Sequence, residues 1–203
     1  QVMYMLELRK RLQAVEEEQR EQTKKRNKLL YQSEHDELTG LYNKRSLNRY
    51  LEDVFEACKL NEKELGILFL DIDYFKQLND RYGHGKGDEG ICAVADTLKR
   101  IFPEDYVARY GGDEFLVVMP ERDLTYAMEH AELLCAGIRE CKIPNEDSEV
   151  ESWLTISVGG VCAIPKEPNR VWDFLSAADN TLYEQKKEQK GKVRFYQGEG
   201  KYL

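Results

Sequence analysis

Two short segments of the chain contain carboxylates at spacings that could bind a metal ion. Asp71 and Asp73 stand at the end of an apolar run of strand length, where residues two apart share a face. Asp113 and Glu114 follow two glycines at the tip of a hairpin pattern. A carboxylate at the end of a buried strand is costly unless a proton or a cation offsets its charge. Because oxygen ligands favour Mg²⁺ or Mn²⁺, the segments indicate a divalent-cation site of the kind used in phosphoryl transfer.

The site forms only if the two segments meet. If the hairpin lies beside the Asp71 strand, the carboxylates converge, and two like charges about 4 Å apart repel by about 4 kcal/mol at an effective dielectric of about 20. A bound cation would remove that repulsion. Taken alone, Asp113 and Glu114 are explained equally well as a solvated turn.

The context of other motifs excludes several further classes of site. Residues 85–90 match G-x-G-x-x-G but do not directly follow a strand, so a dinucleotide site is not predicted. No Gly-Lys pair is followed by Ser or Thr, so the chain has no Walker A loop. After Asp71-x-Asp73, Phe75 and Lys76 occupy the positions where a calcium loop needs a ligand and a glycine.

Helical and strand patterns alternate along the part of the chain that carries these motifs. Helices are predicted at about 44–60, 87–102, 123–140 and 171–189. Strands are predicted at about 66–72, 106–110, 114–119 and 193–196, with a strand pair at 153–164. The order β-α-β-β-α-β predicts an α+β fold, with the helices on one side of the sheet.

Residues 1–35 differ from the rest of the chain. They lack Gly and Pro and carry a net charge of +2, which leaves −10 on residues 36–203, so we expect an N-terminal helix followed by one domain. A 4-3 spacing connects a stripe of eight positions: Met5, Leu8, Leu12, Val15, Gln19, Gln22, Arg26 and Leu29. Five of the eight are apolar, which favours a parallel dimeric coiled coil with a poorly specified centre. The alternative is an amphipathic helix that packs on its own domain.

Composition limits the classes of binding partner and the cellular compartment that we expect for this protein. The net charge of −8 argues against non-specific nucleic-acid binding. No run approaches 18 uncharged apolar residues, so no segment is predicted to span a membrane. The five cysteines are scattered and form no C-x-x-C pair, as in reduced cytoplasmic proteins. A membrane anchor upstream of residue 1 stays compatible with this prediction.

Three motifs together resemble the GGDEF family of diguanylate cyclases. They are the opening motif at 36–45, the block at 71–80 that continues through Gly83-His84 and Gly87-Asp88, and the signature at 111–115. The resemblance covers about residues 33–196 in order and in spacing. It implies a palm-like central antiparallel or mixed sheet flanked by helices, as in nucleotidyl cyclases.

The resemblance also implies an activity and a metal site. In the family, two GTP molecules, one on each protomer of an antiparallel dimer, condense to cyclic di-GMP and pyrophosphate. Asp71, the backbone carbonyl of Ile72, and Asp113 match the Mg²⁺ ligands. Asp113 also matches the proposed base for the ribose 3′-hydroxyl, and Glu114 would support a second metal or that deprotonation.

Further positions match the substrate-binding residues of the family. Asn79 and Asp88 match the pair that reads the guanine edge, which adenine cannot satisfy. His84 matches a substrate-contacting histidine, and the less favoured alternative is that it stabilises a turn.

Another group of residues matches the positions that bind the phosphates of GTP in the family. Tyr74 and Phe75 would offer backbone N–H groups to the phosphates, and Lys76 a point charge. Lys186 fits the phosphate-binding lysine. A second cation is Lys190 by spacing or Lys192 by its neighbouring glycine. The same lysines could instead stabilise a helix C-terminus.

The chain departs from the family at the product-inhibition motif R-x-x-D. Phe102 replaces the arginine, whereas Asp105 is present. The sequence therefore predicts a Mg²⁺-dependent diguanylate cyclase without tight product feedback at that motif. We expect a homodimer controlled through the N-terminal helix, with a sensor domain upstream. The alternative is a catalytically inactive GTP-binding or protein-interaction module.

Overall fold

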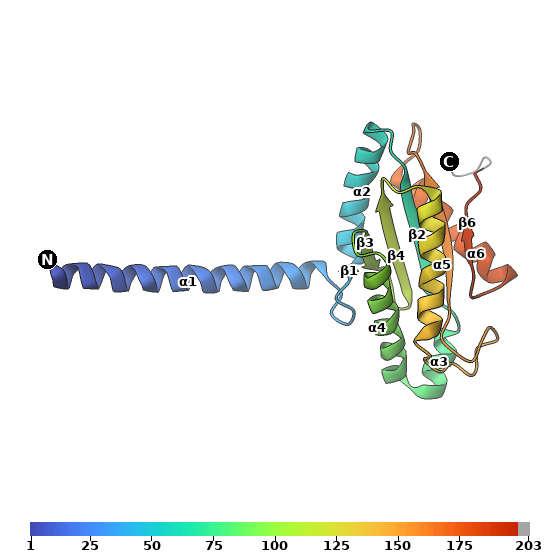
Figure 1. The fold of residues 1–203 in the computed structure, drawn as a ribbon, viewed down its shortest axis with the longest axis horizontal. Helices are drawn as coiled ribbons and strands as arrows, with labels where there is room; N and C mark the ends of the chain where they lie inside the picture. Colours follow the sequence, from blue (N-terminus) through green and yellow to red (C-terminus); the bar gives the residue numbers. More distant parts are fainter. Residues whose placement is uncertain (199–203) are drawn as a thin grey trace. The chain divides into compact units, whose positions relative to one another are not determined.

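The backbone of residues 1–198 is described by a computed structural model (Figure 1), with the side chains of residues 2, 6 and 8 left out. The chain divides into two units at the bond between His35 and Asp36. The first unit contains helix α1 (Val2–Glu34), as the absence of Gly and Pro predicts. Among the described residues, no helix is long and apolar enough to cross a membrane.

The apolar stripe of α1 is exposed to solvent within this unit. Met5, Leu12, Val15 and Leu29 each leave more than half of their surface accessible, between 51% and 62%. Leu8, which the predicted stripe also includes, lies outside the described side chains. The exposed stripe is compatible with a partner helix, and the coiled coil stays a prediction.

The second unit is built on one mixed sheet, which confirms the predicted fold class. Its strand order is β1-β3-β4-β2-β5-β6, with antiparallel pairs in the middle and a parallel pair at each edge. The strands are β1 (Tyr42–Asn43), β2 (Leu65–Ile72), β3 (Tyr106–Arg109), β4 (Glu114–Pro120), β5 (Ile156–Ala163) and β6 (Val193–Phe195). Strand β2 is buried along almost its whole length, as its unbroken apolar sequence requires.

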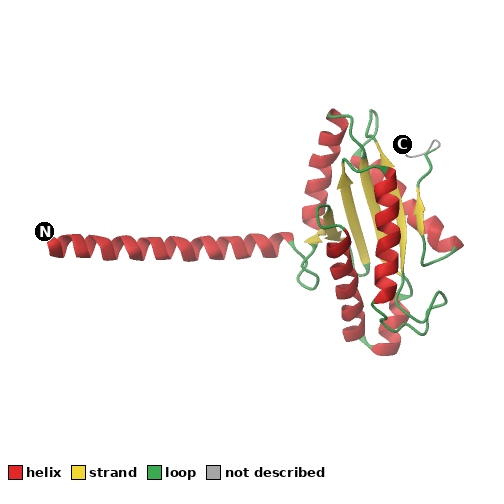
Figure 2. Cartoon of the chain, in the orientation of Figure 1, coloured by secondary structure: helices red, strands yellow, loops and turns green. Residues whose placement is uncertain are grey.

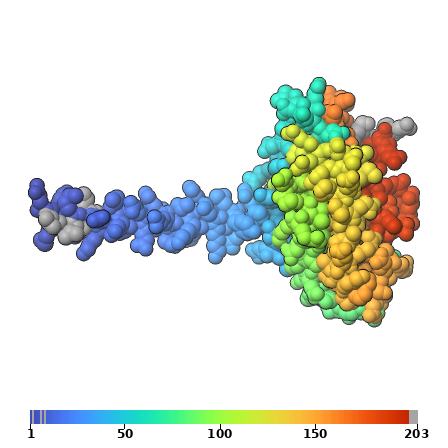
Figure 3. Space-filling model, viewed as in Figure 1, coloured from blue at the N-terminus to red at the C-terminus, as the bar shows by residue number. Residues whose placement is uncertain are grey.

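Helices cover both faces of the sheet, so the prediction that they lie on one side is wrong (Figures 1 and 2). The helices are α2 (Lys44–Leu60), α3 (Phe75–Tyr82), α4 (His84–Ile101), α5 (Leu124–Glu140) and α6 (Val171–Glu188). Leu68 and Leu70 of β2 pack in one core with α4 and α5, whereas Ile67 and Phe69 pack in a second core with α2 and α6. A strand that is apolar at every position needs cover on both faces. Figure 3 shows the face formed by α4 (green) and α5 (yellow).

Two local predictions also differ from the structure. The strand pair expected at 153–164 is a single strand, β5, because Trp153 forms only an isolated bridge to Pro144. Helix α3 was not predicted, and α4 begins at His84 rather than at residue 87. Gly83, at φ +85°, ends α3 and begins α4, so the two helices follow one another without a loop.

Strand β5 and helix α6 approach each other so closely that one position must be glycine. A Cβ added at Gly159 would lie 2.2 Å from the backbone nitrogen of Leu182 and 2.4 Å from the backbone oxygen of Ala178. Both obstacles belong to the backbone of α6, which cannot rotate away as a side chain would. The position of α6 on the sheet therefore depends on this glycine.

We expect Gly159→Ala to lower the free energy of unfolding by about 3 kcal/mol or to prevent folding, because α6 would have to move off the sheet. Gly85→Ala is the control, since a Cβ at Gly85 meets nothing within 4 Å. Its free energy of unfolding should stay within about 1 kcal/mol of wild type. Urea denaturation followed by circular dichroism measures both changes. Equal midpoints for the two variants would contradict this packing argument.

Candidate active site

The carboxylates of the two acidic segments meet where β2 and β4 lie side by side. The antiparallel register pairs Asp71 directly with Glu114, and the backbone N–H of Ile72 donates to the carbonyl oxygen of Asp113 at 3.2 Å. The turn of glycines between β3 and β4 brings the signature to the end of β2. The structure therefore brings together Asp71, Ile72, Asp113 and Glu114. The sequence indicated these residues by their match to the family motifs but did not show that they lie side by side.

Burial makes this acidic group sensitive to charge. Burial raises the pKa of Asp71 to about 6, and the neighbouring carboxylates of Asp113 and Asp73 add to the rise. Lys186, in the last turn of α6, opposes it because its Nζ lies 2.7 Å from Oδ1 of Asp71. The pKa of Glu114 is also raised, first by burial and then by Asp113. A positive charge beside these carboxylates would therefore offset part of the cost of burying them.

An arginine holds the tip that carries Asp113. Arg109 donates from Nε and Nη2 to the carbonyl oxygen of Gly112, at 3.2 and 2.8 Å, and from Nε to that of Gly111 at 3.1 Å. Its Nη1 donates to both carboxylate oxygens of Asp36, at 3.1 and 3.2 Å. The first residue after the His35–Asp36 division is therefore connected to the tip through one side chain. No role was predicted for Arg109 from the sequence, although it lies only two residues before the signature.

The turn after β2 has an unusual backbone. Tyr74 adopts a left-handed conformation, with φ 53° and ψ 34°, which costs a non-glycine residue about 1–2 kcal/mol. Its hydroxyl donates to Oε2 of Glu149 at 3.0 Å, and Nζ of Lys190 lies 3.9 Å from its ring centroid. Of the two lysines that the sequence left open, Lys190 thus contacts this turn. Phe75 packs partly against the core, and Lys76 is exposed.

The α3–α4 pair brings together the residues matched to guanine recognition. A Cβ at Gly87 would lie 2.0 Å from Oδ1 of Asn79, so only glycine lets that amide lie against α4, beside Asp88. Oδ1 of Asn79 is buried and has no hydrogen-bond partner among the residues that the structure describes. Asp88 and His84 are exposed on α4. One unsatisfied acceptor and one exposed carboxylate thus stand on neighbouring helices.

The donor set at the end of β2 fits a hard divalent cation. Within residues 1–198, no group of three or more His, Cys, Asp or Glu side chains is arranged to hold a metal ion. Asp71, Asp113 and the carbonyl of Ile72 offer oxygen atoms only, and the ammonium of Lys186 already stands at one of them. Such an ion would complete its coordination with water or phosphate oxygens, as Mg²⁺ usually does.

Two residues for which the sequence predicted no role at the site also act on Glu114. Lys44, the first residue of α2, lowers the pKa of Glu114, whereas Asp179 of α6 raises it. Nζ of Lys44 lies 3.8 Å from the ring centroid of Tyr110. Lys44 belongs to the opening motif at 36–45, and its membership of that motif is the signal that could have identified it as a site residue.

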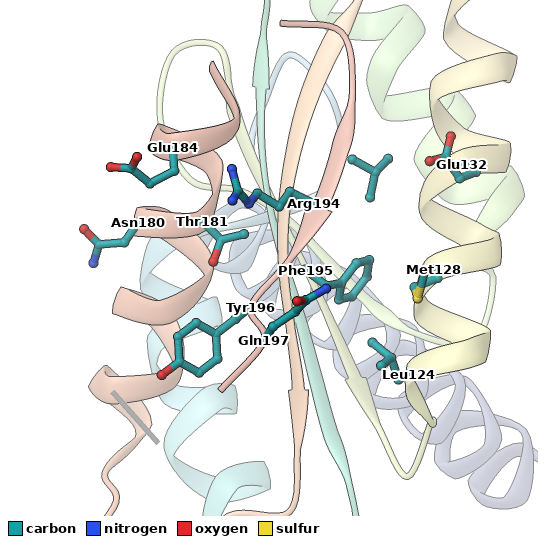
Figure 4. Close-up of a pocket in the computed structure, with 11 residues that line it drawn as sticks. Leu124, Met128, Glu132, Asn180, Thr181, Glu184, Arg194, Phe195, Tyr196 and Gln197 are labelled. Atoms are coloured by element: carbon teal, nitrogen blue, oxygen red, sulfur yellow. The ribbon is translucent and has the colours of Figure 1, made fainter. Parts of the chain in front are cut away.

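A separate hollow lies away from these residues. It has a volume of about 660 Å³ and lies between α5, α6 and β6 (Figure 4). Its lining includes Met128, Thr181, Arg194 and Phe195. None of the residues predicted to bind substrate or metal lines it, so the hollow is distinct from the acidic group at the end of β2.

Comparisons with known proteins agree on one family. The family model described as diguanylate cyclase, GGDEF domain, matches residues 33–192. The chain is 32% identical over 163 residues to the probable diguanylate cyclase DgcC of Escherichia coli strain K12. The aligned region covers 80% of this chain and 43% of that protein. The chain therefore spans less than half the length of this curated relative.

Solved structures show the same fold. The coiled coil and GGDEF domain of DgcB from Caulobacter crescentus, in complex with c-di-GMP, matches with a TM-score of 0.82 at 24% identity, over 93% of this chain and 98% of that chain. The diguanylate cyclase SiaD from Pseudomonas aeruginosa, in complex with its activator SiaC, matches with a TM-score of 0.71 at 27% identity, over 95% of this chain and 74% of that chain.

The raised pKa of Asp71 predicts a pH-dependent stability. The folded state holds this proton more tightly than the unfolded chain, in which the pKa of the carboxyl is 3.8. The contribution of Asp71 to stability is therefore lost as pH rises from about 4 through about 6. Asn carries no charge, and we expect Asp71→Asn to raise the melting temperature above pH 6 but not at pH 4. Thermal denaturation with a metal chelator present measures the difference.

Asp96→Asn is the matched control, because Asp96 is exposed on α4. Its melting temperature should stay close to that of wild type at each pH. An Asp71→Asn variant that is less stable than wild type at pH 8 would contradict the electrostatic interpretation.

Proposed function

This chain belongs to the diguanylate cyclase GGDEF-domain family, and from that premise we propose that it condenses two molecules of GTP to cyclic di-GMP and pyrophosphate. The observation that carries the proposal is the pairing of Asp71 with Glu114, beside Asp113 and under the ammonium of Lys186. Buried carboxylates with a raised pKa at the end of a strand are suited to a divalent cation and to a polyphosphate that shares it.

The triphosphate of GTP is proposed to bind over the start of α3. The first amides of a helix have no intrahelical acceptor, so those of Tyr74 and Phe75 are suited to phosphate oxygens. Lys76 and Lys186 add positive charge, and Lys190 stands beside the same turn. Bound Mg²⁺ would neutralise phosphate charge there, with Asp71, Asp113 and the carbonyl of Ile72 as its protein ligands.

Asp113 is the proposed base for the ribose 3′-hydroxyl. Its tip is fixed by the bonds from Arg109 to the two glycine carbonyls, so its carboxylate is held in place before substrate arrives. Glu114 would support that deprotonation. Asn79 and Asp88 are proposed to read the guanine edge, and the unpaired Oδ1 of Asn79 supports this assignment, because a buried acceptor is costly without a donor.

Two copies of the domain are needed, because one bound GTP cannot close the ring alone. We propose that α1 brings the two copies together, since its apolar stripe is exposed and a coiled coil would bury it. The solved structure of the coiled coil and GGDEF domain of DgcB supports this proposal. Control of the dimer by an upstream sensor domain is part of the same proposal.

We expect the protein to convert GTP to cyclic di-GMP when Mg²⁺ is present. When a chelator removes Mg²⁺, we expect no conversion and only weak binding of GTP. Asp113→Asn should lower kcat by about 100-fold or more, because general base catalysis contributes on that order. The rate per mole of protein should rise with protein concentration, since the dimer is the active form. Chromatography of the products measures the rates, and calorimetry with GTP measures the binding.

Asp96→Asn again serves as the control, since Asp96 is an exposed aspartate outside the site. It should retain the rate of wild type. A wild-type protein that binds GTP but forms no cyclic product at high concentration would favour a non-enzymatic GTP-binding module over the cyclase.

Tight product feedback through the R-x-x-D position is not expected. Phe102, which replaces the arginine, is 1% exposed in the core. The carboxylate of Asp105 accepts from the hydroxyl of Tyr126 at 2.8 Å and faces Nε of Arg122 at 3.8 Å. The residues that would bind the product are therefore engaged within the chain.

Calorimetry of the protein with cyclic di-GMP should detect no micromolar binding that depends on Asp105, because its carboxylate already has two partners. Wild type and Asp105→Asn are compared for this purpose. Binding of the product to wild type that disappears in the variant would show that the position still works as a feedback site.

A further inference from the structure

Two buried hydroxyls, that of Ser157 in β5 and that of Thr155 directly before β5, contact Asp73 beside the proposed phosphate site. Oγ of Ser157 donates to Oδ1 of Asp73 at 2.6 Å and accepts from the backbone N–H of Gly191 at 3.0 Å. Oγ1 of Thr155, at the start of the same strand region, donates to Oδ2 of Asp73 at 2.8 Å. Asp73 precedes the turn into α3, and Gly191 follows the end of α6. The two hydrogen bonds of Ser157 thus join segments that are more than a hundred residues apart in the sequence, and the bond from Thr155 adds a second donor to Asp73.

These bonds lie behind the site and not within it. Asp73 and Ser157 are completely buried, and Thr155 is 1% exposed, so none of them can touch a ligand. Burial raises the pKa of Asp73, and the two hydroxyls oppose that rise. A carboxylate that is buried without donors would be strongly disfavoured, so its position is dictated by the hydroxyls.

The backbone of Asp73 is held as firmly as its side chain. Its N–H donates to the carbonyl of Thr155 at 2.9 Å, and its carbonyl oxygen accepts from Nδ2 of Asn145 at 3.3 Å. The next residue, Tyr74, is the one in the left-handed conformation. Because that conformation is unfavourable for tyrosine, it needs fixed neighbours, and Asp73 supplies the fixed point on its N-terminal side.

The other end of the network fixes the lysine segment. Gly191 has φ +76°, which favours glycine, and its carbonyl oxygen accepts from Nη2 of Arg139 at 2.6 Å. With its N–H on Ser157, both polar groups of this backbone unit are engaged. The preceding residue is Lys190, whose ammonium lies over the ring of Tyr74.

We propose that Thr155 and Ser157 are positioning residues for the phosphates of a nucleoside triphosphate, an inference that rests on the proposed function. Through Asp73 they hold the turn at Tyr74, which presents the first amides of α3. Through Gly191, Ser157 holds the segment that carries Lys190. The network therefore sets the spacing between the amides and the ammonium groups that would contact one polyphosphate.

The first test needs no nucleotide. Thr155→Val removes the hydroxyl and keeps the shape of the side chain, whereas Thr155→Ser keeps the hydroxyl. Amide hydrogen exchange should become faster in Thr155→Val over peptides that cover 73–77, with β2 and α2 unchanged, and should stay at the wild-type rate in Thr155→Ser. Ser157→Ala, a second variant, should also speed exchange over peptides that cover 188–192, since it alone releases Gly191.

Thr181→Val is the matched control. Thr181 is also a buried threonine, but its hydroxyl donates to the carbonyl of Ala177 in its own helix, at 2.7 Å. Its loss should leave exchange over 73–77 unchanged. If Thr181→Val accelerates exchange there as much as Thr155→Val does, or if Thr155→Ser behaves like Thr155→Val, the positioning role is overturned, because general loosening or lost packing explains the result.

The second test uses turnover. In Thr155→Val and in Ser157→Ala, we expect the KM for GTP to rise about tenfold, with kcat within about twofold of wild type, because ground-state contacts to the phosphates are loosened. Thr155→Ser should restore the wild-type KM. Unchanged exchange and unchanged KM in both variants would overturn the inference. A wild-type protein that makes no cyclic di-GMP would instead overturn the proposed function, and the exchange measurements would still decide the positioning role.

Discussion

A carboxylate at the end of β2 lies largely out of water, and the ammonium of Lys186 stands 2.7 Å from it. Burial keeps the pKa of Asp71 near 6, so this residue is charged at neutral pH only at a cost in stability. The arrangement around it follows from that cost. Strand β4 must pair in the register that brings its own acidic residues alongside, and α6 must end where its lysine reaches the carboxylate.

The surrounding fold is rigid where the acidic group requires support. Helices on both faces bury β2, and the close contact at Gly159 fixes α6 on the sheet. Arg109 connects the glycine tip to Asp36, and the hydroxyl of Ser157 connects Asp73 to the segment that follows α6. Strain at Tyr74 and unfavourable charge at Asp71 are thus confined to one end of the sheet, where chemistry would use them.

Membership of the GGDEF family confirms the resemblance that the motifs indicated, and the mixed sheet confirms the fold class. The helix positions were less predictable. An apolar run such as that of β2 shows that a strand is buried, but periodicity alone does not say how many layers cover it. Helix α3 was missed because it is short and follows a tyrosine in the left-handed conformation, which no propensity rule favours.

The sequence by itself determined the acidic segments, the glycine tip, the long N-terminal helix and the family, because each depends on local residue types at fixed spacing. Only the tertiary structure decided that Lys190 contacts the turn at Tyr74, that Arg109 joins Asp36 to the tip, and that two buried hydroxyls hold Asp73. Those contacts join residues up to 116 positions apart (Tyr74 to Lys190). Their formation depends on strand order and helix packing, and these are properties of the whole chain that no single segment encodes.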